Sequence, residues 1–355
     1  MVDAPPDSLR RIASAVESRI DSFLSAEVER WKAIHPDLAE PLILLRANIA
    51  SGGKRLRPAF CHWAFVGAGG DPADPLVIDA GAALELLHSF AVLHDDVMDA
   101  SCVRHGTETV HYAHQTRHRS ASWRGEARRF GDGVAMLVGD LAFVYADLLL
   151  AGMSDEAAAL FTELRLEVNL GQYLDLLGTA RRDSDIETAR RISLYKSGKY
   201  TVERPLHLGA ALAGRLSGPD GLSEALSGYG LAVGEAFQLR DDLLGAFGDP
   251  TVTGKPVGED FREGKPTPLY ALAVAHAGPD ELRSLEALYG TPDLTDDQIA
   301  ALRDLLSRTG ARAAVEDRIG TLVEEGVAAL RGADLAAEAR GELEALARFV
   351  AERDH

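Results

Sequence analysis

A long stretch without proline constrains the fold of this chain more than any other feature. No proline occurs between Pro75 and Pro205, and the interior of an α-helix excludes proline because its ring removes a hydrogen bond and clashes with the preceding turn. Apolar residues also recur at helical spacing from Leu9 to Trp31, and again near Val350. No segment alternates convincingly as a strand would. The sequence therefore predicts an all-α protein with a few long helices.

Breaks in the helical pattern contain glycine, and all but one also contain proline, without the composition of a domain linker. They fall at residues 51–58, 67–75, 117–133, 248–264 and 278–292. We find no repeat of fixed period. We therefore expect residues 1–355 to form one domain, a single large helical bundle around a central cavity. The segment 117–129, rich in Arg, His and Ser, is predicted to be a solvated loop.

The charge balance argues against nucleic acid as a partner. The chain has 55 Asp plus Glu against 37 Lys plus Arg, whereas phosphate backbones require a broad basic face. The N-terminus lacks the basic start and apolar run of a secretory signal, and we find no apolar stretch of the roughly 20 residues that span a membrane. Only Cys61 and Cys102 are present, which favours a reducing compartment, the cytoplasm.

An acidic motif lies inside a helical pattern that starts at Leu76. Asp95 and Asp99 stand one turn apart on one face, where their like charges repel unless a cation lies between them. Mg²⁺ suits such a face, because it takes one or two carboxylates together with water and phosphate oxygens. An exposed acidic surface explains this motif alone equally well, although the flanking residues are too apolar for a simple solvated helix.

A second acidic pair and a basic loop extend this interpretation. Asp241 and Asp242 lie in another apolar helix, and two acidic helices that face each other could hold a diphosphate through bridging metals. The loop 52–58, GGKRLRP, combines glycines that let backbone approach a ligand with Arg side chains that bind phosphate oxygens in pairs. It is not a nucleotide-binding P-loop, because GxxxxGK[ST] is absent.

Six motifs in this order resemble those of the trans-isoprenyl diphosphate synthase (polyprenyl synthetase) family. They are GGKRLRP, LLHSFAVLHDDVMD, VRHG, YKSGK, FQLRDDLLG and TGKPVGED, between Gly52 and Lys265. The resemblance is to the short-chain type, which makes geranylgeranyl or farnesyl diphosphate. It implies an isoprenoid synthase-like fold, condensation of isopentenyl diphosphate with an allylic diphosphate, and a homodimer. Leu137, Val138, Leu141 and Val144 mark a candidate interface helix, although an intramolecular core would have the same pattern.

The resemblance also implies roles for individual residues. Three Mg²⁺ ions on the allylic diphosphate would be held by Asp95 and Asp99, with Asp96 beside them, and by Asp241. The same diphosphate would be contacted by Arg104, Lys196, Lys255 and Lys265, and isopentenyl diphosphate by Lys54, Arg57, His88 and His105. Lys196, Ser197 and Gln238 match the catalytic positions around the reacting carbons, while Gln172 and Asp175 match an element that faces the cavity.

Three residues depart from the family pattern. His105 stands where arginine is usual, which replaces a fixed charge with a titratable one. Gly245 stands at the fifth position of the second motif, where aspartate is usual, and Asp249 one turn further on is a candidate substitute. Ser197 stands where threonine is common, and the hydroxyl is kept.

The length of the product is expected to depend on Phe90. It lies roughly 7.5 Å along the helix before Asp95, and the resemblance makes an aromatic residue there the floor of the cavity. Helical geometry alone leaves this open, since His88 and Ala91 share the Asp95 stripe more closely. The less favoured alternative is that Phe90 packs in the core against a neighbouring helix. The small Ala91 favours geranylgeranyl diphosphate as the product, with farnesyl diphosphate second.

Two other functions stay open. Gly245 and His105 would also suit a non-catalytic subunit that modulates a prenyl synthase. A class I terpene cyclase would share the fold and the magnesium chemistry but has no use for a second diphosphate site at Lys54–Arg57. An assay with isopentenyl diphosphate and each allylic primer discriminates among the three.

Overall fold

This computed structural model describes residues 6–104, 106–248 and 258–353. The all-α prediction is confirmed. The elements are α1 (Asp7–Lys32), the 3-10 helix η1 (Pro36–Ala39), α2 (Glu40–Ala50), α3 (Leu56–Gly67), α4 (Pro75–Met98), β1 (Val103–Arg104), β2 (Thr107–Glu108), α5 (Val110–Ser120), α6 (Ala127–Leu149), α7 (Asp155–Arg181), α8 (Ile186–Ser193), the π-helix η2 (Leu194–Glu203), α9 (Arg204–Leu212), α10 (Ser223–Phe247), α12 (Glu259–Glu263), α13 (Pro268–His276), α14 (Pro279–Leu288), α15 (Asp296–Arg308), α16 (Ala311–Ala329) and α17 (Ala337–Glu352).

The proline-free stretch forms three of the long helices of the protein. α4 has 24 residues, α6 has 23 and α7 has 27. The prolines that bound the stretch both stand in the first turn of a helix, α4 and α9, where a missing N–H is tolerated. Asp74 caps α4 by accepting a hydrogen bond from the Leu76 N–H at 2.9 Å.

One short hairpin was not predicted. Strands β1 and β2 pair antiparallel, with Val103 opposite Glu108 and Arg104 opposite Thr107. Two residues per strand are too few to produce a recognisable alternation in the sequence. The hairpin follows the acidic end of α4 and turns Arg104 back toward it.

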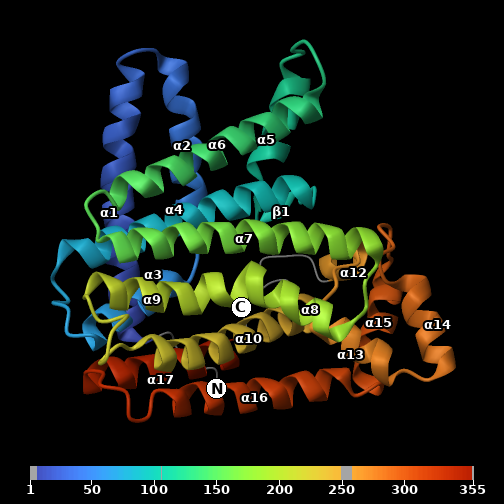
Figure 1. Ribbon diagram of the computed structural model, residues 1–355. Helices are drawn as coiled ribbons and strands as arrows, with labels where there is room; N and C mark the ends of the chain where they lie inside the picture. The colour runs from blue at the N-terminus through green and yellow to red at the C-terminus, as the bar shows by residue number, and fades with distance from the viewer. Residues whose placement is uncertain (1–5, 105, 249–257, 354–355) are drawn as a thin grey trace.

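The helices around the centre of the molecule run roughly side by side. In Figure 1, α4, α7, the η2–α9 pair, α10 and α17 follow one another from top to bottom, and η2 packs against both α7 and α10. The α1–α2 and α5–α6 hairpins project at the top of the view. The predicted loop at 117–129 is shorter than expected, since α5 extends to Ser120 and α6 begins at Ala127.

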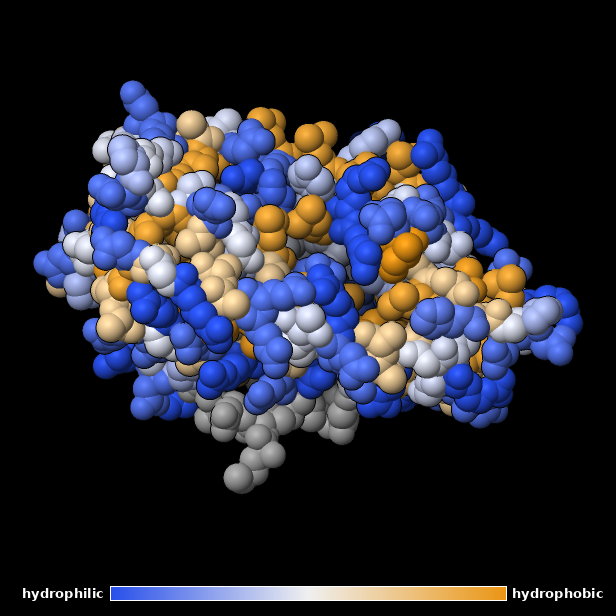
Figure 2. Space-filling model, turned by 60° about the horizontal axis from the view of Figure 1, so that its bottom comes forward, coloured by the Kyte–Doolittle hydropathy of each residue, from blue (hydrophilic) through white to orange (hydrophobic). Residues whose placement is uncertain are grey.

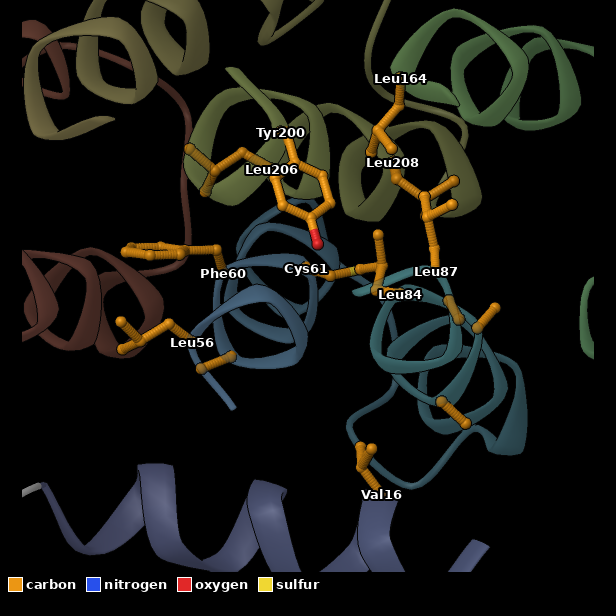
Figure 3. Packing of buried hydrophobic residues seen from close by; sticks show 14 of the residues in the cluster. Val16, Leu56, Phe60, Cys61, Leu84, Leu87, Leu164, Tyr200, Leu206 and Leu208 are labelled. Carbon is orange, nitrogen blue, oxygen red and sulfur yellow. The ribbon is translucent and has the colours of Figure 1, made fainter. Parts of the chain in front are cut away.

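Buried side chains gather into two clusters. The larger one contains residues of α1, α3, α4, α7, η2 and α9, ten of which are labelled in Figure 3. The second contains residues of α10 and the helices from α12 to α16. α10 joins the two, because Tyr229 and Val233 belong to the first cluster and Leu239 and Leu243 to the second.

α4 corrects one expectation from the sequence. By length and composition it could cross a membrane, although no such stretch was expected. However, 67% of its most apolar window is buried inside the protein, as in the central helix of a core. Figure 2 shows one face of the molecule, on which hydrophilic residues predominate and hydrophobic ones lie between them in small groups.

Candidate active site

A cavity of about 640 Å³ lies between α3, α4, α7, η2, α10 and α12. Most of the predicted site residues line it: Lys54, Arg57, His88, Ala91, Asp95, Asp99, Arg104, Lys196, Ser197, Gln238, Asp241 and Lys265. His105, Lys255 and Asp249 lie outside the described residues. Residues from distant parts of the sequence therefore converge on one cavity, as their motif order implied.

Asp95 is the most heavily contacted acid of the cavity. Its Oδ1 accepts hydrogen bonds from Lys196 Nζ at 3.0 Å and from Gln172 Nε2 at 2.9 Å, and Arg104 reaches its Oδ2 at 3.4 Å. Burial opposes the charged form, but the charges of Lys196, Lys265 and Arg104 outweigh burial and lower the pKa of Asp95. Asp95 is therefore held as a carboxylate.

Asp99 behaves differently from its neighbour one turn away. Lys265 Nζ donates a hydrogen bond to Asp99 Oδ2 at 2.8 Å. Burial and the negative charge of Asp95 nevertheless raise the pKa of Asp99. The contribution of Asp95, smaller than that of burial, is the like-charge repulsion expected from the spacing of the motif. The adjacent Asp96 is only 2% exposed and is held by Arg104 Nε at 2.6 Å, so it positions Arg104 and does not line the cavity.

The second acidic pair faces the cavity from α10. Arg353 donates a hydrogen bond to Asp241 Oδ1 at 2.7 Å. Asp242 is 3% exposed and accepts a hydrogen bond from Gln238 Nε2 at 2.8 Å on Oδ1, while its Oδ2 has no hydrogen-bond partner in the described part of the chain. Burial, followed by the charges of Asp260 and Asp241, raises the pKa of Asp242 well above its ordinary value.

The basic loop brings Lys54, Arg55 and Arg57 to the cavity, and one of them, Arg55, also holds the loop in place. Arg57 donates a hydrogen bond to Thr201 Oγ1 at 2.9 Å and lies 4.2 Å from the Tyr200 ring centre, and His88 Nδ1 lies 2.8 Å from Tyr200 Oη. Arg55 is 5% exposed and is bound by Glu85 at 2.8 Å, so it anchors the loop.

A π-helix carries Lys196, Ser197 and Tyr200 into the cavity. η2 spans Leu194–Glu203, and the Arg204 N–H bonds to the carbonyl of Lys199, five residues back. Glycines allow close approach on both sides: a Cβ on Gly171 of α7 would clash with the Lys196 backbone, and one on Gly234 of α10 would lie 2.7 Å from the Gly198 carbonyl oxygen. Sequence reasoning missed this π-helix, a form often found at functional sites.

The donor set of the cavity fits a hard divalent cation. The facing acids supply only carboxylate oxygens, and one buried oxygen, Asp242 Oδ2, lacks a partner in the described chain. In the same described ranges, no three His, Cys, Asp or Glu side chains already form a cluster that could hold a metal. Mg²⁺ suits such an open arrangement, since it keeps waters and takes substrate oxygens alongside one or two carboxylates.

The two chain-length residues lie in different environments. Ala91 lines the cavity, whereas Phe90 does not. The Phe90 ring is 9% exposed and packs 4.8 Å from Phe143 and 4.6 Å from His94, measured between ring centres. Phe90 therefore packs against Phe143 of α6, whereas its neighbour Ala91 forms part of the cavity wall.

A helical fold with two facing groups of acids, surrounded by lysine and arginine around one cavity, defines a prenyltransferase of the isoprenoid synthase fold. The sequence pattern of the family described as polyprenyl synthetase matches residues 42–306. The chain belongs to this family, which confirms the resemblance drawn from its motifs.

Relatives with known names and structures support this assignment. The chain is 33% identical to the geranylfarnesyl diphosphate synthase of Aeropyrum pernix, over 78% of this chain and 82% of that protein. It is 32% identical to the (2E,6E)-farnesyl diphosphate synthase of Mycobacterium bovis, over 85% and 80%. Its fold resembles the crystal structure of geranylgeranyl pyrophosphate synthase from Corynebacterium glutamicum complexed with isoprenyl diphosphate and magnesium, with a TM-score of 0.91, 38% identity, and coverage of 97% and 99%.

Proposed function

We propose that this enzyme condenses isopentenyl diphosphate head-to-tail with an allylic diphosphate to make a short trans-prenyl diphosphate. The observation that carries the proposal is that one cavity is lined by two separate sets of charged groups, each suited to a diphosphate. One set contains Asp95, Asp99 and Asp241, and the other contains Lys54 and Arg57. A class I terpene cyclase needs only the first set.

The first set would hold the allylic diphosphate. Asp95, Asp99 and Asp241 would bind Mg²⁺, three ions by resemblance, and the metal would stabilise negative charge on the leaving diphosphate. Arg104, Lys196 and Lys265 contact the same acids in this structure, at 3.4, 3.0 and 2.8 Å. They would donate to the leaving group, and each such preorganised contact is worth about 3 kcal/mol. Lys255 joins this set by resemblance.

The second substrate would react from the other side of the cavity. Lys54, Arg57, His88 and, by resemblance, His105 would bind isopentenyl diphosphate. As the C–O bond to the allylic diphosphate breaks, the isopentenyl double bond forms the new C–C bond, and the departing diphosphate accepts the proton that is lost. Ser197 and Gln238 line the cavity beside Lys196 and Asp241 and would orient the reacting carbons.

We propose geranylgeranyl diphosphate as the main product and farnesyl diphosphate as the second. Ala91, which lines the cavity, leaves room where a larger residue would stop the tail sooner. Phe90, the residue before Ala91, forms an aromatic pair with Phe143. The named relatives are synthases of geranylfarnesyl, farnesyl and geranylgeranyl diphosphate, so the proposed product length rests on these residues.

We propose that the enzyme acts as a cytoplasmic homodimer in which residues 1–355 form one domain. The four residues predicted for the interface lie in two environments. Leu137 and Val144 are 64% and 55% exposed, whereas Val138 is buried in the core and Leu141 packs against the core. Exposed Leu148 continues the first face on α6, and α7 adds Leu166, Leu170 and Tyr173. A second copy of the chain would cover this apolar surface. One domain is supported by α10, which belongs to both clusters.

The test is to mix the purified chain with Mg²⁺, isopentenyl diphosphate and, separately, dimethylallyl, geranyl and farnesyl diphosphate, and then to size the products. We expect geranylgeranyl diphosphate from all three primers. A chain that makes no product alone but changes the product of another synthase would be a modulatory subunit. A cyclic hydrocarbon formed without isopentenyl diphosphate would identify a cyclase.

A further inference from the structure

The missing acid of the second motif leaves a space that another carboxylate fills. Gly245 lies on α10, four residues after Asp241. A Cβ built on Gly245 would lie 2.6 Å from Asp260 Oδ2, closer than real Cβ contacts come. The Gly258 N–H also bonds to the Gly245 carbonyl at 3.3 Å, which fixes the start of α12 against α10. Any side chain at position 245 would therefore displace the Asp260 carboxylate.

Asp260 faces the same groups as the acids of α10. It lines the cavity together with Asp241, Asp242 and Lys265. Asp242 gives independent support for a bound cation at this place. This residue is 3% exposed, and its Oδ2 accepts no hydrogen bond from the described residues.

We propose that Asp260 supplies the outer carboxylate of the second acid group, in the space that Gly245 leaves open, and that it holds Mg²⁺ there together with Asp241. This inference rests on the proposed function. It replaces Asp249 as the substitute for the missing acid. The carboxylates of Asp241 and Asp260 repel each other when no cation lies between them, and a divalent cation with its waters removes that repulsion.

The first experiment measures metal binding, not turnover. Mg²⁺ is titrated calorimetrically into the protein saturated with farnesyl thiolodiphosphate, an allylic analogue that does not react. Asp260→Asn should weaken Mg²⁺ binding by about 10- to 100-fold, the usual cost of losing a supporting metal contact. Asp296→Asn, which changes an exposed acid in the first turn of α15, is the matched control and should bind as the wild type does.

A second pair of variants tests the shared space directly. Gly245→Asp alone should also weaken binding, because two carboxylates then compete for one position. The double variant Gly245→Asp/Asp260→Ala should recover the wild-type affinity to within a few-fold. Melting temperatures without metal identify any variant that has lost the packing of α12, and the double variant then decides the question.

The outcomes separate this inference from the function on which it rests. Wild-type protein that binds no Mg²⁺ with the analogue would refute the proposed function. Wild-type protein that binds Mg²⁺ while Asp260→Asn binds equally well would overturn only the role of Asp260. The same holds if Asp249→Asn, and not Asp260→Asn, weakens binding, because that result would return the acid to Asp249.

Discussion

Arg353 and Asp241 form an ion pair that joins the end of the chain to the second acid group. Besides its 2.7 Å bond to Asp241, the Arg353 guanidinium donates to the Phe237 carbonyl at 3.1 Å and lies 4.3 Å from the Phe237 ring centre. Its side chain is only 4% exposed. In this structure the Arg353 guanidinium therefore occupies a carboxylate, Asp241, that we assign to Mg²⁺.

Replacing Arg353 should expose this competition. Arg353→Gln should tighten the binding of Mg²⁺ to the substrate-free enzyme, because the metal no longer displaces a guanidinium from Asp241. It should also lower the melting temperature in EDTA, since it removes a buried partner of Asp241 and Phe237. Calorimetric titration with Mg²⁺ and a thermal scan check both effects. Weaker Mg²⁺ binding in this variant would show that Arg353 supports the metal site.

The first acid group should matter for turnover more than for binding of the second substrate. Asp95→Ala or Asp99→Ala should lower kcat roughly 100- to 1,000-fold, because the lost metal contact acts on the charge that develops on the leaving group. The KM for isopentenyl diphosphate should change little. Steady-state kinetics with both substrates check this, and equal losses in the two quantities would contradict the assigned role.

Product length should respond to the residues around Phe90. Ala91→Phe should shift the product toward farnesyl diphosphate, because Ala91 forms the cavity wall. Phe90→Ala should lengthen the product while turnover on short primers is kept. Chromatography of the products checks both. If Phe90 is only a core residue, Phe90→Ala will instead lose stability, about 3–5 kcal/mol, with an unchanged product.

The effect of His105 on the KM for isopentenyl diphosphate should depend on pH. His105→Arg should lower the KM for this substrate at pH 8, where imidazole is mostly neutral, and change it little near pH 5.5, where the imidazole already carries a charge. KM values at the two pH values provide the measurement. An effect of equal size at both would show that His105 does not face the substrate.

Stability in acid should depend on His207. Burial, helped by the neighbouring Arg204, lowers the pKa of His207 to about 4 from its ordinary 6.5. The unfolded chain binds this proton at a higher pH than the folded protein does. The contribution of neutral His207 to the free energy of unfolding is therefore fully present above pH 6.5 and is lost as pH falls toward 4. The free energy of unfolding should fall by about 3 kcal/mol across that window. His207→Gln should flatten this part of a pH series of denaturant unfolding curves, and an unchanged slope would refute it.

Sequence reasoning found the chemistry of the site better than its geometry. Asp95 and Lys196 lie in motifs whose order identifies the family, and the structure places them 3.0 Å apart. Arg353 belongs to no motif, and only the packing of α17 brings it to Asp241. Asp260 was part of a recognised motif, but its relation to Gly245 depends on a contact between two helices. The left-handed backbone of the basic loop buries Arg55, which the pattern GGKRLRP could not separate from Arg57.

The glycines on either side of η2 fix one part of the active site through backbone contacts, whereas another part is formed by side chains that mutation can change. At Gly171, Gly198 and Gly234, the backbone of one helix lies against the backbone of the next. A side chain added at any of these glycines would clash with backbone, so substitutions there cannot shift Lys196 by a small amount. The wall near Ala91 and Phe90 is made of side chains, which can be exchanged one at a time. Descendants of this sequence can therefore explore new product lengths by single mutations while the position of Lys196 is inherited unchanged.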